Sequence, residues 1–458
     1  MLNLKNLKDK TFHFIGIGGI SMSALAQILM KNGYKVQGSD VAENSETIKL
    51  KKKGVKVFGC HKANNLRGVK VVVYTSAIHD GNEELEYAKS HGLLIIKRAE
   101  LLGAIARQYM TVIAVAGSHG KTTATGMISE VFMQAGLKPT FLVGGALNSV
   151  HSNFAIGNKK FFIAEACEYM DNYLYIKPDI SVILNVDSDH LDYFKDLEGV
   201  KRSFGKFKAN TKKDGISVLC LDDENSKELI DKEDSVTFGF SKKADLHAVN
   251  IKEYKPCHYS FDAVFMKCKL GNIKLNIVGR HNILNALCAV MVGLACAIDF
   301  CDIKLAIENF SGVERRCEKL CDLNKAEVYH DYAHHPAQIE KMMKVAKDLT
   351  AKSHGKIITV FEPHTFSRTK FLLDEFAKSF EGSDRLILAP VYSAREDESE
   401  GLNSKQLAKA CKSHVQDVCV IDTFDEIYDE IVSTIKPNDV VMILGAGTIE
   451  HLASKFKK

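Results

Sequence analysis

The strongest chemical signal in the sequence is a glycine-rich turn, AGSHGKTT at residues 116–123, between an apolar run and a helical pattern. Its glycines allow the backbone to fold around phosphate oxygens, the Lys121 ammonium can bridge the β- and γ-phosphates, and the Thr122 hydroxyl can bind Mg²⁺. The P-loop pattern is shortened, because Val115 stands where that pattern has its first glycine. The turn predicts an ATP site formed by Gly117, Ser118, His119, Gly120, Lys121, Thr122 and Thr123.

Acidic residues and a histidine follow the next apolar runs: Glu165 and Glu168 after one run, Asp187 and His190 after another. The carboxyl ends of parallel strands meet at the ligand crevice of a sheet, so Glu165 could share the Mg²⁺ held by Thr122. His190 could bind a second Mg²⁺ or a bridging water, although Mg²⁺ prefers oxygen ligands. Glu168 and Asp187 are secondary candidates, because surface carboxylates at strand ends are common.

Residues 279–286, GRHNILNA, open a long apolar helical pattern. Asn282 and Asn285 are three positions apart and therefore share a helix face. Their amides could read an adenine edge, with His281 beside the ring. The alternative for Asn282 is an ordinary helix cap.

A second glycine-rich turn, GIGGIS at residues 16–21, also follows a strand pattern and opens a helix. Backbone N–H groups at such a turn favour a phosphate or pyrophosphate. Asp40 follows the second strand at about the position of the ribose-binding carboxylate of dinucleotide folds, which makes an NAD site one interpretation. Ser21 replaces the third glycine of that fingerprint, and a tight turn without any ligand is the other interpretation.

Composition narrows the class of protein. With 46% hydrophobic and 26% charged residues the chain is too apolar to be disordered, and no apolar run reaches the roughly 18 residues of a membrane span. A net charge of +4, from 61 basic and 57 acidic residues, disfavours dedicated nucleic-acid binding. Twelve cysteines without a C-x-x-C pair indicate reduced thiols and no zinc site. Because residues 1–10 lack the apolar core of a signal peptide, we expect a cytoplasmic protein.

These groups have to be positioned by alternating strands and helices, the pattern of parallel sheets with crossover helices. The pattern restarts twice in the 458 residues, which predicts three α/β domains at 1–106, 107–310 and 311–458. The main predicted strands are at residues 11–17, 35–38, 69–75, 93–97, 111–116, 161–164, 180–185, 217–221, 327–329, 357–361, 385–388 and 440–444. The clearest predicted helices are at residues 21–32, 122–134, 282–297 and 337–349.

With these motifs in order, the sequence resembles the Mur ligase superfamily over essentially the whole chain. Three blocks of the last domain add to the resemblance: RRCE at 315–318, DYAHHP at 331–336 and PHTFSR at 363–368. The resemblance implies Rossmann-like first and last domains around a central P-loop-type domain with a mostly parallel sheet. It implies an ATP-dependent ligase that phosphorylates the lactyl carboxylate of UDP-N-acetylmuramate and joins L-alanine to it through a tetrahedral intermediate.

The resemblance also implies roles for residues. The catalytic group would be Lys121, Glu165, His190 and Arg316, with two Mg²⁺ ions held by Thr122, Glu165 and His190. ATP would also meet His281, Asn282, Asn285, Arg316 and, at its ribose, Asp331. The first glycine turn would hold the sugar nucleotide instead of NAD, through Gly16, Gly18, Gly19, Ser21, Asp40, His61 and Ser76. L-Alanine would be bound by Tyr332, His334 and Arg368.

The sequence departs from the family pattern at two positions. Phe204 stands where several relatives carry a carbamylated lysine, and Thr365 stands where some carry a further arginine. Open alternatives are a recycling ligase that adds a preformed tripeptide, an NAD-dependent oxidoreductase and a nucleotide-binding module without catalysis. The expected partners are small-molecule substrates, with no nucleic acid and no membrane, and the expected state is a monomer or weak homodimer.

Overall fold

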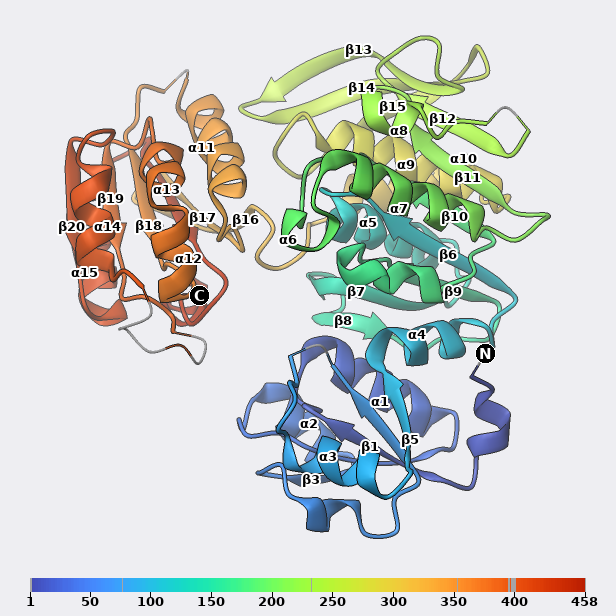
Figure 1. Cartoon of the computed structure of the whole chain (residues 1–458). Helices are drawn as coiled ribbons and strands as arrows, with labels where there is room; N and C mark the ends of the chain where they lie inside the picture. The colour runs from blue at the N-terminus through green and yellow to red at the C-terminus, as the bar shows by residue number, and fades with distance from the viewer. Residues whose placement is uncertain are drawn as a thin grey trace. The chain divides into compact units, whose positions relative to one another are not determined.

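The computed structural model describes residues 2–75, 77–231, 233–351, 353–393, 396 and 401–457 (Figure 1). The chain forms two compact units. The first comprises Met1–Ile251, Phe261–Lys274 and His281–Ser311, and the second comprises Lys252–Ser260, Leu275–Arg280 and Gly312–Lys458. The five-stranded sheet lies in the first unit, as does the ten-stranded sheet apart from residues 252–260, and the six-stranded sheet lies in the second unit. No helix of the described residues is both long enough and apolar enough to cross a lipid bilayer.

The first sheet has the strand order β3-β2-β1-β4-β5, and all its neighbours are parallel. Its strands are β1 (Thr11–Ile15), β2 (Lys35–Ser39), β3 (Lys56–Phe58), β4 (Val71–Tyr74) and β5 (Leu94–Lys97). Its helices are η1 (Leu4–Leu7), α1 (Ile20–Lys31), α2 (Ser45–Lys52), η2 (Ala63–Leu66), α3 (Glu83–Ser90) and α4 (Arg98–Ala106). The order reverses between β1 and β4, where open parallel sheets of this kind hold ligands at their carboxyl edge.

The second sheet has ten strands in the order β15-β14-β13-β12-β11-β10-β6-β9-β7-β8. Its parallel strands are β6 (Thr111–Ala116), β7 (Thr140–Leu147), β9 (Phe161–Glu165), β10 (Ile180–Ile183), β11 (Ile216–Cys220) and β12 (Ser235–Gly239). It is extended by β8 (Ser152–Ala155), β13 (Leu246–Lys255), β14 (His258–Phe265) and β15 (Cys268–Lys274). Every residue of β6 after Thr111 is buried, as a central strand covered on both faces requires.

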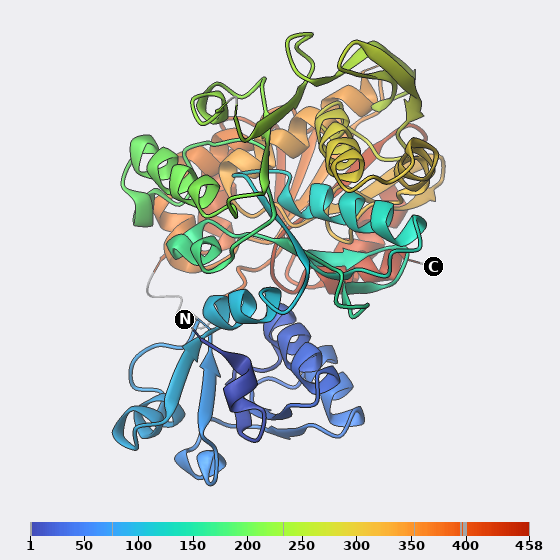
Figure 2. The same cartoon turned by 90° about the vertical axis from the view of Figure 1, so that its right-hand side faces the viewer.

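The helices of this sheet include a packed group, α5, α9 and α10, visible in Figure 2. The helices are α5 (Lys121–Gln134), η3 (Tyr169–Tyr175), α6 (Leu191–Phe194), α7 (Leu197–Ala209), α8 (Glu224–Lys227), α9 (Asn282–Ala295) and α10 (Phe300–Asn309). One continuous core joins the first two sheets, since Leu25 of α1 and Ile105 of α4 belong to the same buried cluster as Phe162 of β9. Each such side chain contributes about 1.5–3 kcal/mol by leaving water.

The packing of α4 against η3 is especially close. A Cβ at Gly103 would lie 2.1 Å from the carbonyl oxygen of Tyr175, so only glycine fits there. The start of α4, next to the first sheet, is therefore fixed to the segment that follows β9.

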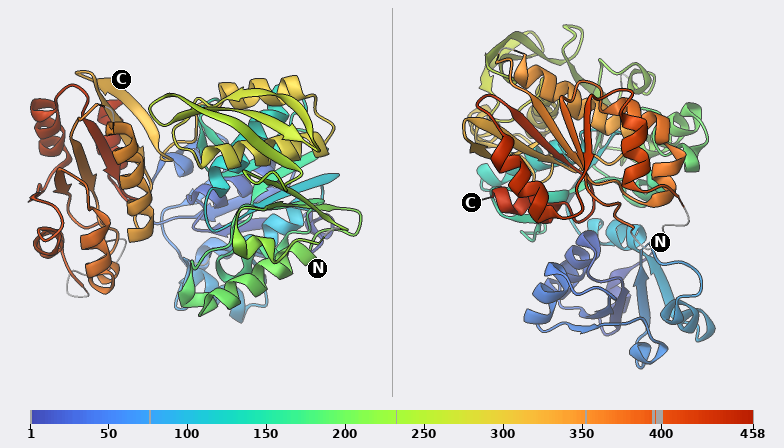
Figure 3. Two further views of the ribbon diagram at one scale, coloured as in Figure 1. Left: turned by 90° about the horizontal axis from the view of Figure 1, so that it is seen from above. Right: turned by 90° about the vertical axis from the view of Figure 1, so that its left-hand side faces the viewer.

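The sheet of the second unit has the order β16-β17-β21-β18-β19-β20, with an antiparallel β16–β17 pair and parallel neighbours elsewhere. Its strands are β16 (Glu318–Leu323), β17 (Ala326–Asp331), β18 (Ile357–Phe361), β19 (Arg385–Leu388), β20 (Asp417–Val420) and β21 (Val440–Leu444). Its helices are α11 (Pro336–Thr350), α12 (Phe366–Phe371), α13 (Leu373–Ser379), α14 (Ser404–Cys411), α15 (Phe424–Thr434) and α16 (Glu450–Phe456). Two buried clusters, one with α11, α13 and α14 and one with α15 and α16, show that helices cover both faces (Figure 3).

The predicted fold class of three α/β domains with mostly parallel sheets is confirmed. The predicted strands and helices all exist, with ends that differ by one or two residues; the strand predicted at 11–17 ends at Ile15 because Gly16 turns the chain at φ +80°. The prediction missed β3, β7, β8 and β12, the β13–β15 extension, and the outer strands β16 and β20. The domain boundaries after residues 106 and 310 remain a proposal; α4 ends at Ala106 and Phe310 caps α10.

Candidate active site

The phosphate loop between β6 and α5 has a defined shape of its own. Gly117 and Gly120 adopt φ +148° and +82°, values that L side chains rarely take, and Gly120 caps α5. Asn185, just past β10, holds the loop through both backbone polar groups of His119: its Oδ1 accepts from the His119 N–H at 2.8 Å and its Nδ2 donates to the His119 carbonyl at 3.1 Å. The loop is thus pre-organised to present backbone N–H groups.

Lys121 lies across this loop. Its ammonium donates to the carbonyl oxygens of Gly117 at 2.5 Å and Ser118 at 3.3 Å, and to Glu168 Oε1 at 2.9 Å. Burial acts to lower the pKa of Lys121, but the carboxylates of Glu168 and Glu165 outweigh it and raise that pKa above its usual value. The lysine is therefore charged at neutral pH.

Two acidic groups lie beside the lysine. In the first, Glu165 Oε2 accepts from the Thr122 hydroxyl at 3.0 Å and from the Gly144 N–H at 2.8 Å. In the second, one ligand atom each of Glu168, Asp189 and His190 lies within 4.8 Å of the others. Of the three predicted metal ligands, Thr122 and Glu165 thus lie together and His190 lies with Glu168 and Asp189. Asp189 was missed, although its place after β10 was a usable signal.

Glu168 has the most unusual environment of these residues. Its side chain is 1% exposed, and its Oε2 atom has no hydrogen-bond partner among the described residues. An unpaired buried carboxylate oxygen is costly, and a bound cation would satisfy it. The donor set of carboxylates, a hydroxyl and an imidazole therefore fits a divalent metal ion. Phe204, at the position of the carbamylated lysine, is fully buried against Tyr173 and offers no ligand.

The backbone around the second acidic group is held in an uncommon conformation. Met170, Asp171 and His190 adopt φ +54°, +56° and +54°. The Asp171 carboxylate accepts a hydrogen bond from the Tyr193 hydroxyl at 2.9 Å and one from Ser203, and the rings of Tyr169 and His190 lie 4.7 Å apart. Strained residues that the surroundings fix in this way are typical of functional sites.

The predicted adenine-reading residues lie at the loop. Asn285 Nδ2 donates to Asn282 Oδ1 at 2.8 Å, both side chains are buried, and a Cβ at Gly120 would lie 2.9 Å from Asn285 Oδ1. His281 is the residue just before α9. The two amides thus share a helix face beside the phosphate loop, and one hydrogen bond joins them.

The first glycine turn is closed by Asp40. Gly16 donates its N–H to the Ser39 carbonyl at 2.8 Å, and Gly18 donates its N–H to Asp40 Oδ2 at 2.8 Å. Gly19 is the extended residue before α1. Asp40 also lines a small pocket with Thr47 and Phe58. The structure thus brings the predicted turn and its carboxylate together; Ser76 lies outside the described residues.

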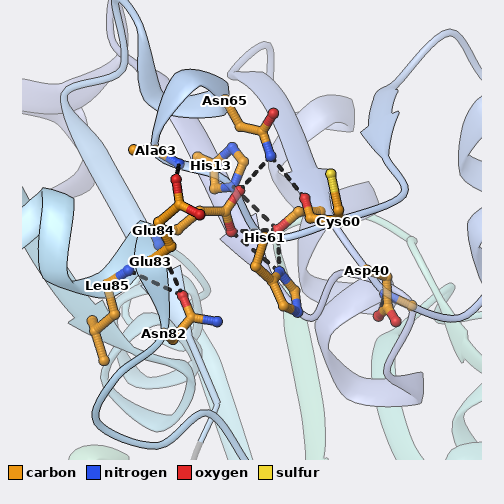
Figure 4. A network of polar contacts seen from close by, with 12 residues as sticks. His13, Asp40, Cys60, His61, Ala63, Asn65, Asn82, Glu83, Glu84 and Leu85 are labelled. Atoms are coloured by element: carbon orange, nitrogen blue, oxygen red, sulfur yellow. Dashed lines mark hydrogen bonds and ion pairs between the residues drawn. The ribbon is translucent and has the colours of Figure 1, made fainter.

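A buried polar network lies next to this turn (Figure 4). Glu84 is fully buried; Ser39 and Asn65 donate to its two carboxylate oxygens at 2.5 and 2.7 Å, and His13 and His61 each lie 3.2 Å from it. Burial acts to raise the pKa of Glu84, but the hydrogen bonds from the two histidines outweigh it and lower that pKa to about 2. His61 was a predicted site residue; Glu84 and His13 were missed.

In the second unit, Asp331 ends β17 and its oxygens are both bonded. Oδ2 accepts from the Cys317 N–H at 2.7 Å and Oδ1 from the Ala333 N–H at 2.8 Å. Burial raises the pKa of Asp331, while Arg316 acts in the other direction. The Arg316 guanidinium lies 5.6 Å from the centre of the Tyr332 ring. Arg316, which precedes β16, therefore lies near Asp331 and Tyr332 at the carboxyl end of β17.

A second group in this unit combines one cation with imidazoles. His334 donates from Nδ1 to the Tyr332 carbonyl at 2.9 Å, its ring lies 5.8 Å from that of His364, and Arg368 Nη1 lies 3.5 Å from His364 Nδ1. Burial and the nearby Arg368 lower the pKa of His334 to about 4 and also lower that of His364. Both rings are neutral at pH 7, so the charge of this group lies on Arg368. His364 was missed as a candidate.

The comparisons with known sequences cover all three domains. Family models match at residues 11–110 (Mur ligase family, catalytic domain), 115–293 (Mur ligase middle domain) and 315–447 (Mur ligase, glutamate ligase domain). The chain is 42% identical over 451 residues to the UDP-N-acetylmuramate–L-alanine ligase of Caldanaerobacter subterraneus subsp. tengcongensis, covering 98% of this chain and 97% of the relative. It is 43% identical over 441 residues to the ligase of that name from Caldicellulosiruptor saccharolyticus, covering 96% of each.

Solved structures of related ligases have the same fold. The fold matches UDP-N-acetylmuramate-alanine ligase MurC from Thermotoga maritima with a TM-score of 0.82 at 29% identity over 98% of each chain. It matches a murein peptide ligase from Psychrobacter arcticus with a TM-score of 0.71 at 22% identity over 98% of each chain, a likeness of fold alone. On the full-length identity to the two ligases and the three domain matches, this chain belongs to the Mur ligase family.

Proposed function

We propose that this protein is a cytoplasmic, ATP-dependent ligase that joins L-alanine to the lactyl carboxylate of UDP-N-acetylmuramate in peptidoglycan precursor synthesis. The observation that carries the proposal is the phosphate loop with a charged Lys121 beside Glu165 and Glu168, in a chain that is similar to such ligases over its whole length. The NAD-dependent alternative explains none of these groups. A ligase for a preformed tripeptide is less well supported, since solved structures of such ligases are 22% and 26% identical to this chain, against 42% and 43% for the two L-alanine ligases.

The proposed reaction has two steps. A carboxylate oxygen of the sugar nucleotide attacks the γ-phosphorus of ATP, the bond to ADP breaks, and an acyl phosphate forms. The amine of L-alanine then attacks the acyl carbon, loses a proton, and the tetrahedral intermediate collapses to the amide and inorganic phosphate. The first step brings anion to anion, so preorganised positive charge has to line the site.

The residues of the phosphate loop support the first step. Backbone N–H groups between Gly117 and Thr123 would bind the phosphates, and Lys121 would exchange its bonds to the loop carbonyls for phosphate oxygens. Asn282, Asn285 and His281 would bind the adenine. Thr122, Glu165, Glu168, Asp189 and His190 would hold Mg²⁺. The metal supplies Lewis-acid stabilisation of the transferring phosphoryl group when bound.

The other site residues would serve substrate binding. We assign Gly16, Gly18, Gly19, Ser21, Asp40, His61 and Ser76 to the sugar nucleotide, Arg316 and Asp331 to ATP, and Tyr332, His334 and Arg368 to L-alanine. Because its imidazole neighbours are neutral at pH 7, Arg368 is suited to bind a carboxylate through its planar fork. We further propose the domain boundaries 1–106, 107–310 and 311–458 and a monomer or weak homodimer.

Phosphate release tests the function. UDP-N-acetylmuramate, ATP and Mg²⁺ are mixed with the enzyme while L-alanine is present, omitted or replaced by the tripeptide L-alanyl-γ-D-glutamyl-diaminopimelate. We expect turnover that requires L-alanine. Turnover with the tripeptide alone would identify a recycling ligase, and no turnover in any mixture would contradict the ligase assignment.

A further inference from the structure

Arg98 occupies a place in the fold that no role described so far uses. It is the first residue of α4 and follows β5 directly. The turn after β1, Asp40 after β2 and Arg98 after β5 therefore all lie at the carboxyl edge of one parallel sheet. Ligands of such sheets bind at this edge.

The side chain of Arg98 points to the first glycine turn. Its Nη1 donates to the Ser21 hydroxyl oxygen at 3.2 Å, across 77 positions of the sequence. Ser21 is the second residue of α1, immediately after the turn. The guanidinium therefore lies beside the place where the proposed function puts the pyrophosphate.

The charge of Arg98 is not balanced by a carboxylate among the described residues. Burial lowers the pKa of Arg98, and the group that acts in the other direction is the thiol of Cys167. Arginine stays charged even so. By contrast, Arg315 is paired with Glu450 at 2.9 Å and Arg385 with Glu430 at 2.8 Å.

A partly buried cation without a counter-ion destabilises the protein that carries it, and one serine hydroxyl only partly offsets this cost. An anion bound at the turn would offset it. A guanidinium fork can donate to two oxygens of one anion, which suits a pyrophosphate better than it suits a single hydroxyl. The environment of Arg98 is thus explained by a ligand more readily than by packing.

Arg98 also connects the two sheets of its unit. It begins the helix that packs against η3 at Gly103 and Tyr175, and η3 follows the strand that ends at Glu165. We propose that Arg98 binds the pyrophosphate of the sugar nucleotide together with Ser21, and so fixes the substrate relative to the acidic residues that follow β9. This inference rests on the proposed function.

Calorimetric binding of uridine, UDP, UDP-N-acetylglucosamine and UDP-N-acetylmuramate tests the inference. For Arg98→Met we expect the affinity for the three diphosphates to fall by about ten- to a hundredfold, as for a lost charge-assisted hydrogen bond. Uridine, which has no phosphate, should bind as it does to the unmodified protein. Arg98→Lys keeps the charge without the fork and should lose less than Arg98→Met.

The matched control is Arg107→Met, which removes a second arginine just past α4, one that donates to the Leu2 carbonyl at 3.0 Å. It should bind all four ligands normally.

Unchanged diphosphate affinity in both Arg98 variants would overturn the inference. A loss confined to UDP-N-acetylmuramate would place Arg98 at the lactyl carboxylate and also overturn it. If the unmodified protein binds no uridine nucleotide, the proposed function fails instead. If Arg98→Met does not fold, Arg98→Lys decides: normal affinity for UDP contradicts the inference, and a several-fold loss supports it.

Discussion

Two buried glutamates, one beside each glycine turn, differ in how their carboxylates are satisfied. Glu84, linked to the first turn through Ser39, has partners on both oxygens. Glu168, beside the second turn, bonds to Lys121 through one oxygen, and the other has no partner among the described residues. A carboxylate whose partners are all protein groups fixes a structure, whereas one with a buried unpaired oxygen is prepared for a ligand.

The two turns also differ in how the cation beside each of them is paired. At the second turn Lys121 already has a carboxylate partner, so a bound phosphate has to share the lysine with Glu168. At the first turn the Arg98 guanidinium has the Ser21 hydroxyl as its only hydrogen-bond partner among the described residues. We infer that the second turn suits a phosphoryl group that is transferred together with metal ions, and that the first suits a diphosphate that is only held.

The largest effect is expected for Lys121→Ala. Without the ammonium the transferring phosphoryl group loses its nearest protein cation, and turnover should fall by at least about a thousandfold. Binding of UDP-N-acetylmuramate should change less than about threefold, because the proposed sugar-nucleotide residues belong to the first sheet. Steady-state phosphate release and calorimetry measure the two quantities.

Lys206→Ala, an exposed lysine on α7, is the control for Lys121→Ala and should leave both quantities unchanged. Parallel losses of turnover and sugar-nucleotide binding in Lys121→Ala would contradict the division of tasks between the two turns.

Glu168→Gln should lower turnover by about a hundredfold, since it removes a proposed metal ligand and the carboxylate charge that balances the buried Lys121 ammonium. The Mg²⁺ concentration for half-maximal activity should rise. Because the Glu168 carboxylate helps to raise the pKa of Lys121 against burial, that pKa should fall in the variant, and the alkaline limb of the pH–rate profile should move to lower pH. A normal Mg²⁺ requirement with an unmoved alkaline limb would show that Glu168 is a structural residue.

The sequence predicted the second turn well because its partners are set by local rules. Thr122 lies two residues past Gly120, and Glu165 ends the strand next to β6, so the strand-end rule alone brings them together. The rule also covers Arg98, which was overlooked. It does not cover Glu84. Acidic residues are common in the first turn of any helix, where they interact favourably with the helix dipole, so this position alone indicates no site. Its partner His13 lies 71 positions away, inside β1.

The β13–β15 extension was missed for a related reason. Its burial pattern is irregular and largely exposed along β13 and β15, so the period-2 alternation that identifies a half-buried strand is weak there. His364 was missed because its neighbour His334 comes from another element and meets it only in the folded chain; Arg368, four positions further along, was a local signal.

Glu84→Gln should differ from Glu168→Gln, with a pH-dependent loss of stability and only a small direct effect on phosphoryl transfer. The pKa of Glu84 is lowered from 4.5 to about 2 on folding. A lowered carboxyl pKa contributes stability at pH values above 4.5, and this stability is lost as the pH falls from 4.5 to about 2. The shift corresponds to about 3 kcal/mol at pH 7.

Urea unfolding of the unmodified protein and Glu84→Gln between pH 7 and pH 2.5 measures this difference. We expect the variant to unfold with about 3 kcal/mol less free energy at pH 7 and the gap to close toward pH 2.5, where the native carboxylate is itself close to protonation. Glu86→Gln removes an exposed carboxylate from the same helix, paired with Lys89, and should change stability by less than about 0.5 kcal/mol. A gap that stayed constant with pH would mean that Glu84 acts through shape and hydrogen bonding alone, and the contrast with Glu168 would then lie in geometry and not in charge.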